Sequence, residues 1–169
     1  MEKILLCIPP VGYVGYPTNY LPTISAMLKE SDKKVKVHEL NIDFMNFFLE
    51  KNEEKIRKNC ISELDFWTKM ASKYFHDTNF KALSRMLRKS EDFFERTIKS
   101  LKLQGVDAIC FLFEYPRVHI YDSFFWIVKL LQEIKDSYDI TTLMVGSDFM
   151  LLSKEDLRFI LSRYEPIAG

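Results

Sequence analysis

The stretch KILLCIPPVGYVGYPTNYLPTISAMLKE, from Lys3 to Glu30, contains the first strand, loop and helix that the sequence predicts. Its apolar run, Ile4–Ile8, is typical of a strand that is covered on both faces. Pro9 and Pro10 end the run, because proline has no backbone N–H and disfavours helix at the residue before it. From Tyr20 onward, apolar residues recur at the spacing of one helix face. The stretch therefore predicts a buried strand, a loop rich in glycine and tyrosine, and a helix.

The same alternation of strand and helix continues along the chain. Further strands are predicted at Val35–Asp43, Val106–Glu114 and Ile140–Gly146, and the tail PIAG, residues 166–169, predicts the start of a fifth strand. A helix is predicted over Ile120–Ile134, and another begins at Ser153. Strands that alternate with helices indicate a parallel sheet covered on both faces. We therefore expect one α/β domain over residues 1–169: a doubly wound, mostly parallel five-stranded sheet of flavodoxin-like or Rossmann-like type in three layers.

The segment from Phe44 to Leu103 interrupts this alternation. It contains neither proline nor glycine, and its apolar residues recur at helical spacing. We expect a helical insertion of two or three helices between the second and third strands. Ser62 and Asp77–Asn79 are the predicted breaks or caps, and Gly105 is predicted to end the last helix.

Composition limits the classes of partner. The chain has 169 residues, 47% of them hydrophobic, and 24 basic residues balance 24 acidic ones. Such a chain offers no global field for nucleic acid or an anionic membrane, and no apolar run approaches the roughly 20 residues of a membrane-spanning helix. Cys7, Cys60 and Cys110 lie far apart and form no sequence-local metal motif. An odd number of cysteines without a signal peptide favours the reducing cytoplasm.

Ligands of doubly wound sheets bind beyond the carboxyl ends of the strands, where the strand order changes direction. The loops at these ends hold the candidate binding residues. The first loop is no phosphate cradle, because it lacks the Gly-Lys-Ser/Thr ending of a Walker motif and its two prolines remove N–H donors. The predicted binding residues are Pro10, Val11, Gly12, Tyr13, Gly15, Tyr16, Asn19, Glu114, Tyr115, His119, Gly146, Ser147 and Asp148.

Each of these residues also has a purely structural interpretation. Gly12 and Gly15 suit a tight turn as well as a ligand contact. His119 is more often a polar loop residue than a metal ligand or an acid–base group, and Asp148 could cap a turn. Glu114 ends an apolar strand and needs a partner, which could be a neighbouring side chain or a ligand hydroxyl. No histidine cluster or catalytic triad can be assembled, so we predict neither catalytic residues nor metal ligands.

The order of these motifs resembles the N-terminal cobalamin-binding-type domain of radical S-adenosylmethionine enzymes. KILLCIPP, the helix LPTISAMLK and the strand VKVHELNID resemble the opening of that domain, and GVDAICFLFE, TTLMVGSDF and YEPIAG resemble its later strands. The resemblance covers the chain apart from the helical insertion. It implies a Rossmann-like domain that holds cobalamin at the carboxyl ends of its strands. The iron–sulfur cluster and S-adenosylmethionine would belong to a radical domain downstream.

The chain departs from this family in three ways. It lacks the D-x-H-x-x-G motif whose histidine ligates cobalt, it has Ser147 in place of the second glycine of a GG pair, and it lacks C-x-x-x-C-x-x-C. The resemblance thus implies a non-catalytic binding module that holds a corrinoid or docks the catalytic domain and substrate. Its partner would be a radical domain expected after Gly169 or a separate protein, with a peptide as one candidate substrate and methyl transfer as one candidate reaction. We expect either an isolated domain or a natural stand-alone relative.

Two other interpretations remain open. A degenerate domain that no longer binds cobalamin would serve as a docking surface for a peptide or protein, and the surplus of aromatic residues favours that interpretation. A stand-alone flavodoxin-like enzyme would use Glu114 and His119.

Overall fold

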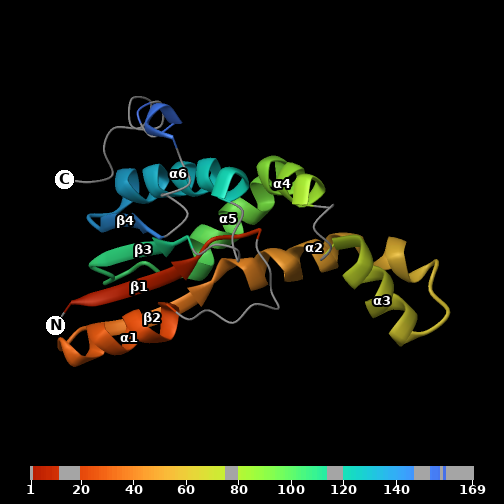
Figure 1. Ribbon diagram of the computed structural model, residues 1–169, viewed down its shortest axis with the longest axis horizontal. Coiled ribbons are helices and arrows are strands. Elements are labelled where there is room, and N and C mark those ends of the chain that lie inside the picture. The colour runs from red at the N-terminus through yellow and green to blue at the C-terminus, as the bar shows by residue number, and fades with distance from the viewer. Residues whose placement is uncertain are drawn as a thin grey trace.

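The structure is a computed structural model that describes residues 2–11, 20–74, 80–113, 120–146, 153–156 and 158 (Figure 1). Over these residues the elements follow in the order β1 (Lys3–Ile8), α1 (Tyr20–Glu30), β2 (Lys34–Glu39), α2 (Leu40–Arg57), α3 (Glu63–Tyr74), α4 (Phe80–Lys89), α5 (Glu91–Leu101), β3 (Ala108–Leu112), α6 (Ile120–Ser137) and β4 (Thr141–Val145).

The four strands form one sheet in the order β2-β1-β3-β4, and every neighbouring pair is parallel. This confirms the predicted α/β class with a parallel sheet. The described residues hold four strands, and the predicted fifth strand falls in residues 166–169, outside them. In this order β2 lies on one side of β1, whereas β3 and β4 lie on the other side. The strand order therefore changes direction between β1 and β3.

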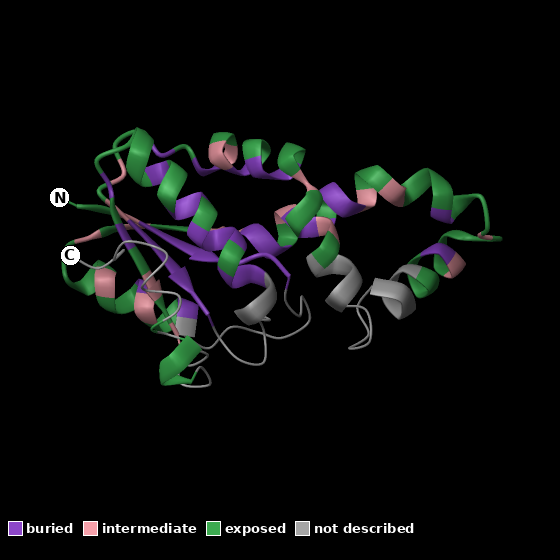
Figure 2. Ribbon diagram, turned by 90° about the horizontal axis from the view of Figure 1, so that it is seen from above, coloured by how far each residue is buried: buried purple, intermediate pink, exposed green. Residues whose placement is uncertain are grey.

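Helices cover both faces of this sheet. Right-handed crossovers that run in opposite directions along a sheet place their helices on opposite faces. Accordingly α1 lies on one face, whereas α5 and α6 lie together on the other (Figures 1 and 2). A helical turn follows Ser153, where a helix was predicted to begin, and the N–H of Asp156 donates to Ser153 Oγ (3.0 Å).

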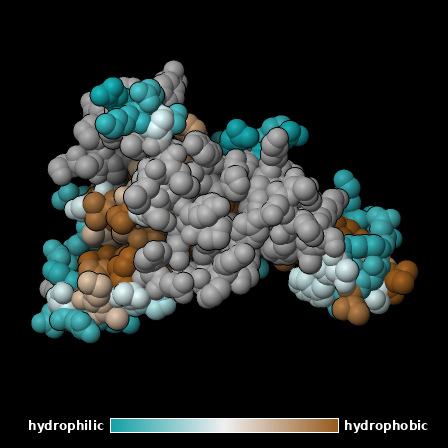
Figure 3. Space-filling model, in the orientation of Figure 1, coloured by the Kyte–Doolittle hydropathy of each residue, from teal (hydrophilic) through white to brown (hydrophobic). Residues whose placement is uncertain are grey.

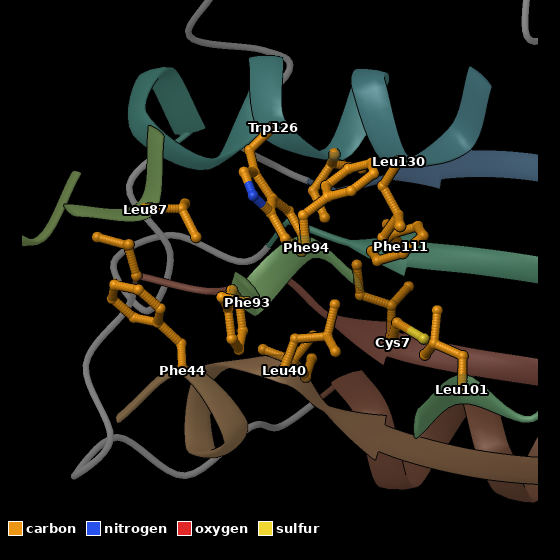
Figure 4. Close-up of a cluster of buried hydrophobic side chains, with 14 of the residues drawn as sticks. Cys7, Leu40, Phe44, Leu87, Phe93, Phe94, Leu101, Phe111, Trp126 and Leu130 are labelled. Carbon is orange, nitrogen blue, oxygen red and sulfur yellow. The ribbon is translucent and has the colours of Figure 1, made fainter. Parts of the chain in front are cut away.

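The core lies between β1, β3 and the helices α5 and α6. Leu5, Cys7 and Ile8 of β1 have no exposed surface, as expected of a central strand. On the face of α5 and α6, Trp126 stacks on Phe93 with ring centroids 5.4 Å apart (Figure 4). Aromatic pairs at this distance add to the stability gained from area burial. This contact attaches the insertion, through α5, to α6.

The boundaries of the insertion differ from the prediction. The second strand ends at Glu39 rather than Asp43, and α2 begins at Leu40 with no loop between them. The described part of the insertion contains four helices instead of two or three. Ser62 does precede α3 as predicted, and its Oγ accepts the N–H of Asp65 (3.1 Å), while residues 77–79 lie outside the described part.

The end of the insertion also differs. The last helix, α5, ends at Leu101 rather than at Gly105, and Lys102 takes the left-handed conformation (φ 48°) that commonly ends a helix. Gly105 (φ 70°) lies in the turn that follows. The break between α4 and α5 at Ser90 was not predicted.

The far half of α2 and the helix α3 extend away from the sheet as an arm (Figure 1). Arg57 joins the two helices, because its guanidinium donates to Glu53 (2.6 Å) and Glu63 (2.5 Å) and lies 4.0 Å from the ring centroid of Phe66. The hydrogen bonds from Arg57 hold the pKa of the Glu63 carboxyl below its usual value. Among the described helices, none combines the length and apolar character needed to cross a membrane.

Candidate functional site

The carboxyl end of β1 is tightly packed. Pro9, Pro10 and Val11 are all buried, and Val11 has no exposed surface. Val11 also has a φ of 61°, a left-handed conformation that is unfavourable for a β-branched residue. Such a conformation persists only where the surrounding structure imposes it, and it occurs most often at functional sites. Val11 therefore holds an unfavourable backbone conformation in a fully buried position just after β1.

Ser123 of α6 anchors this end of β1. Its side chain is fully buried, and its Oγ donates a hydrogen bond to the carbonyl oxygen of Pro10. Pro10 and Ser123 are far apart in the sequence, so the contact ties the first loop to the helix that follows β3. Sequence reasoning missed Ser123, because a serine inside an apolar helix gives no sign of a partner more than a hundred residues away.

The carboxyl ends of β3 and β4 are joined through Gly146. The N–H of Phe113 donates to the carbonyl oxygen of Val145 (2.7 Å). A Cβ atom on Gly146 would lie 1.8 Å from the carbonyl oxygen of Phe113, so only glycine fits there. The ring of Phe113 in turn faces Phe124 of α6, with centroids 6.2 Å apart. The first turns of α6 thus contact the ends of both β1 and β3.

We call the side of the sheet where β1, β3 and β4 end the carboxyl edge. Of the predicted binding residues, Pro10, Val11 and Gly146 are described, and all three lie at this edge. Pro10 and Val11 are buried, so their side chains pack inside the protein at this edge and are not exposed on it. The other predicted residues lie outside the described part of the chain: Gly12, Tyr13, Gly15, Tyr16, Asn19, Glu114, Tyr115, His119, Ser147 and Asp148.

A polar pair that sequence reasoning also missed lies at the end of β2. His38 Nε2 is 2.6 Å from Asp43 Oδ2, and the side chain of His38 is 17% exposed. The pair forms because α2 begins directly after β2 and brings its first turn back over the strand. Asp43 lies in that turn because β2 ends at Glu39. The sequence prediction extended the strand to Asp43, so it placed both residues on one strand and missed their contact.

A groove of about 220 Å³ lies between α2 and α5 beside this pair. Asp43, Phe47, Glu50 and Arg96 are among the side chains that line it. Arg96 donates to Glu50 (2.7 Å), and its guanidinium lies 5.3 Å from the ring centroid of Phe47. Glu50 and Arg96 are therefore paired with each other, and Asp43 is paired with His38.

The described residues offer little for catalysis or metal binding. No three His, Cys, Asp or Glu side chains among them are arranged to hold a metal ion. Burial raises the pKa of the Cys7 thiol well above its usual value and raises that of Cys110 to about 11. Thiols in that state are poor nucleophiles at neutral pH. The described part of the carboxyl edge consists of the buried residues Pro9, Pro10 and Val11 together with Gly146, which has no side chain.

No protein-family model matches the chain, and neither does any curated protein or solved structure with which it was compared.

Proposed function

We propose that the chain is a cobalamin-binding-type domain that holds a corrinoid at the carboxyl edge of its sheet. The observation that carries the proposal is the strand order β2-β1-β3-β4, with its change of direction between β1 and β3. Ligands of doubly wound sheets bind at such a point, and the same order begins the flavodoxin-like sheet. A fifth strand at residues 166–169, next to β4, would complete that sheet.

The described residues that follow β1 and β4 at the carboxyl edge are apolar or lack a side chain. Pro9, Pro10 and Val11 give the edge an apolar floor without free charge, and Gly146 presents no side chain. The described histidine, His38, is engaged by Asp43 at the end of β2. The described residues would therefore hold the corrinoid through apolar and backbone contacts.

The walls of the site would come from the loops beside this floor. In the proposal, the first loop contributes Tyr13, Tyr16 and Asn19, the loop after β3 contributes Glu114 and His119, and Ser147 and Asp148 follow β4. Tyrosine suits such a wall because it combines an apolar ring with a polar hydroxyl. When bound, the corrinoid would supply cobalt-centred group transfer. A radical S-adenosylmethionine domain, downstream or on a separate protein, would act on the substrate, with a peptide as one candidate.

A titration of hydroxocobalamin with the protein in excess tests the proposal. We expect a shifted corrin absorption spectrum and retention of the corrinoid in equilibrium dialysis. The double variant Tyr13→Ala/Tyr16→Ala should weaken binding at least tenfold. Tyr138→Ala is the matched control, because Tyr138 is partly exposed and lies between α6 and β4, at the opposite end of the strands.

Absence of binding at millimolar hydroxocobalamin would reject the corrinoid and favour the interpretation as a degenerate interaction domain. Equal weakening by the Tyr138 control would show that the corrinoid binds elsewhere on the molecule.

A further inference from the structure

The outer face of the helix α4 carries positive charge only. Arg85, Arg88 and Lys89 are exposed, and the sequence has no acidic residue between Asp77 and Glu91. Their spacing of three and four residues places the three cations on one side of the helix. Figure 3 shows hydrophilic side chains over α4. We call these three residues the α4 basic face.

These cations lack the partners that neighbouring cations have. Within the described part of the chain, no side chain of the α4 basic face forms an ion pair or a hydrogen bond. Arg96 of the next helix, by contrast, donates to a glutamate. Glu91 and Asp92, the first acidic residues after α4, pair with Lys129 and Lys51. The nearest carboxylates in the sequence are therefore already engaged by other cations.

The helix itself does not explain this charge. Cations in the last turn of a helix interact favourably with its dipole, and Arg88 and Lys89 lie there. Arg85 lies one turn earlier, where the dipole has little effect. Like charges three and four residues apart also destabilise a helix. The α4 basic face therefore lowers the stability of the free helix, and a bound anion would remove the repulsion.

We propose that the α4 basic face docks an acidic segment of a partner protein. Carboxylates three or four residues apart on that segment would match Arg85 and Arg88, because each guanidinium can donate two parallel hydrogen bonds to one carboxylate. Charge complementarity at an exposed surface contributes more to specificity and association rate than to affinity. We therefore expect a weak, salt-sensitive complex.

Two other anionic partners match this helix less well. Proteins that bind nucleic acid contact many phosphates and stack single-stranded bases on aromatic rings, whereas the α4 basic face has few cations and the described part of α4 exposes no aromatic residue. A helix on a membrane surface inserts its apolar side. In α4 that side is used within the protein, since Leu87 is 1% exposed and Met86 packs against the core.

Fluorescence anisotropy of a labelled helical peptide, with glutamates three and four residues apart, measures the interaction. The full chain is added up to about 1 mM at low ionic strength. We expect saturable binding that weakens as salt is added. Arg85→Gln/Arg88→Gln should raise the dissociation constant about fivefold or more. Lys34→Gln/Lys36→Gln is the matched control, because it removes the same charge from exposed residues of β2; it should leave the constant within twofold.

Charge exchange provides the sharper test. Arg85→Glu/Arg88→Glu should no longer bind the glutamate peptide, and it should bind the same peptide with lysine in place of glutamate. The wild type should bind the lysine peptide more weakly than this variant does. A variant with a damaged α4 would bind neither peptide, so the exchange separates loss of charge from loss of structure.

Three results would overturn the proposal. They are absence of binding to the glutamate peptide at the highest protein concentration, equal weakening by the control on β2, and a charge-exchanged variant that still binds the glutamate peptide. Tighter binding of a single-stranded oligouridylate or of phosphatidylserine vesicles through the same arginines would also overturn it, in favour of nucleic acid or a membrane.

Discussion

At the scale of single residues, Gly146 lies so close to the backbone of Phe113 that any side chain would collide with it. We expect Gly146→Ala to lower the free energy of unfolding by about 3 kcal/mol or more, because the new Cβ would have to displace a carbonyl oxygen rather than a flexible side chain. Gly105→Ala is the control: its Cβ would meet only Lys3 Nζ at 3.3 Å, and its positive φ should cost about 1 kcal/mol. Urea unfolding measures both. Equal losses would contradict the close approach at Gly146.

Thr142 is a single residue whose replacement is expected to stabilise the protein. Its Oγ1 is buried in the sheet and has no hydrogen-bond partner within the described part of the chain. We expect Thr142→Val to raise the free energy of unfolding by about 1 kcal/mol, because valine has the same shape without an unsatisfied hydroxyl. Thr97→Val is the matched control and should lower it by about 1 kcal/mol, since Thr97 Oγ1 donates to the carbonyl oxygen of Phe93 (2.8 Å). A loss of stability in Thr142→Val would show that the hydroxyl is satisfied, for instance by water.

At the scale of elements, the joint between α2 and α3 depends on Arg57. Its hydrogen bonds to Glu53 and Glu63 are exposed and stabilise the whole fold little. They do link the end of α2 to the start of α3, together with the contact to the ring of Phe66. We expect Arg57→Met to speed amide hydrogen exchange in α3 severalfold while exchange in the sheet stays unchanged. Lys58→Met, which breaks the neighbouring exposed pair with Glu54, should leave exchange in α3 as it was. Faster exchange in the sheet would instead show that Arg57 supports the whole domain.

The elements that could be predicted are those whose ends the sequence marks. The strands β1, β3 and β4 were found because each is a short, largely apolar run with a proline or glycine soon after it. The boundary between β2 and α2 was misplaced because Leu40 follows Glu39 without a loop, and the alternation of the strand passes directly into the spacing of the helix. The helix end at Lys102 was missed because a lysine in the left-handed conformation leaves no mark in the sequence, whereas Gly105 nearby has the residue type that commonly marks such an end.

At the scale of the whole molecule, the location of the carboxyl edge was predictable and its internal contacts were not. Parallel topology places the ends of β1, β3 and β4 on one side, so Pro10, Val11 and Gly146 could be assigned to it from the order of elements. The contact between Ser123 and Pro10 depends on how α6 lies across the sheet, which no local pattern encodes. The loops that would form the walls of the proposed site lie outside the described residues, so their contribution stays a prediction.

Two buried thiols, Cys7 and Cys110, lie on the neighbouring strands β1 and β3, and they make the free energy of unfolding fall at alkaline pH. Burial raises the pKa of Cys110 to about 11 and that of Cys7 further, above the value of about 8.5 expected in the unfolded chain. A thiol whose pKa is higher in the folded state than in the unfolded state contributes its full stability at pH values below the unfolded-state pKa. That contribution is lost as the pH rises toward the folded-state pKa. We therefore expect the free energy of unfolding to fall between about pH 9 and pH 11, by up to roughly 1.4 kcal/mol per pH unit for each thiol.

Urea unfolding at several pH values measures this slope. The double variant Cys7→Ala/Cys110→Ala should be less stable at pH 7 but should have a shallower slope, and an unchanged slope would mean that other groups cause the alkaline loss.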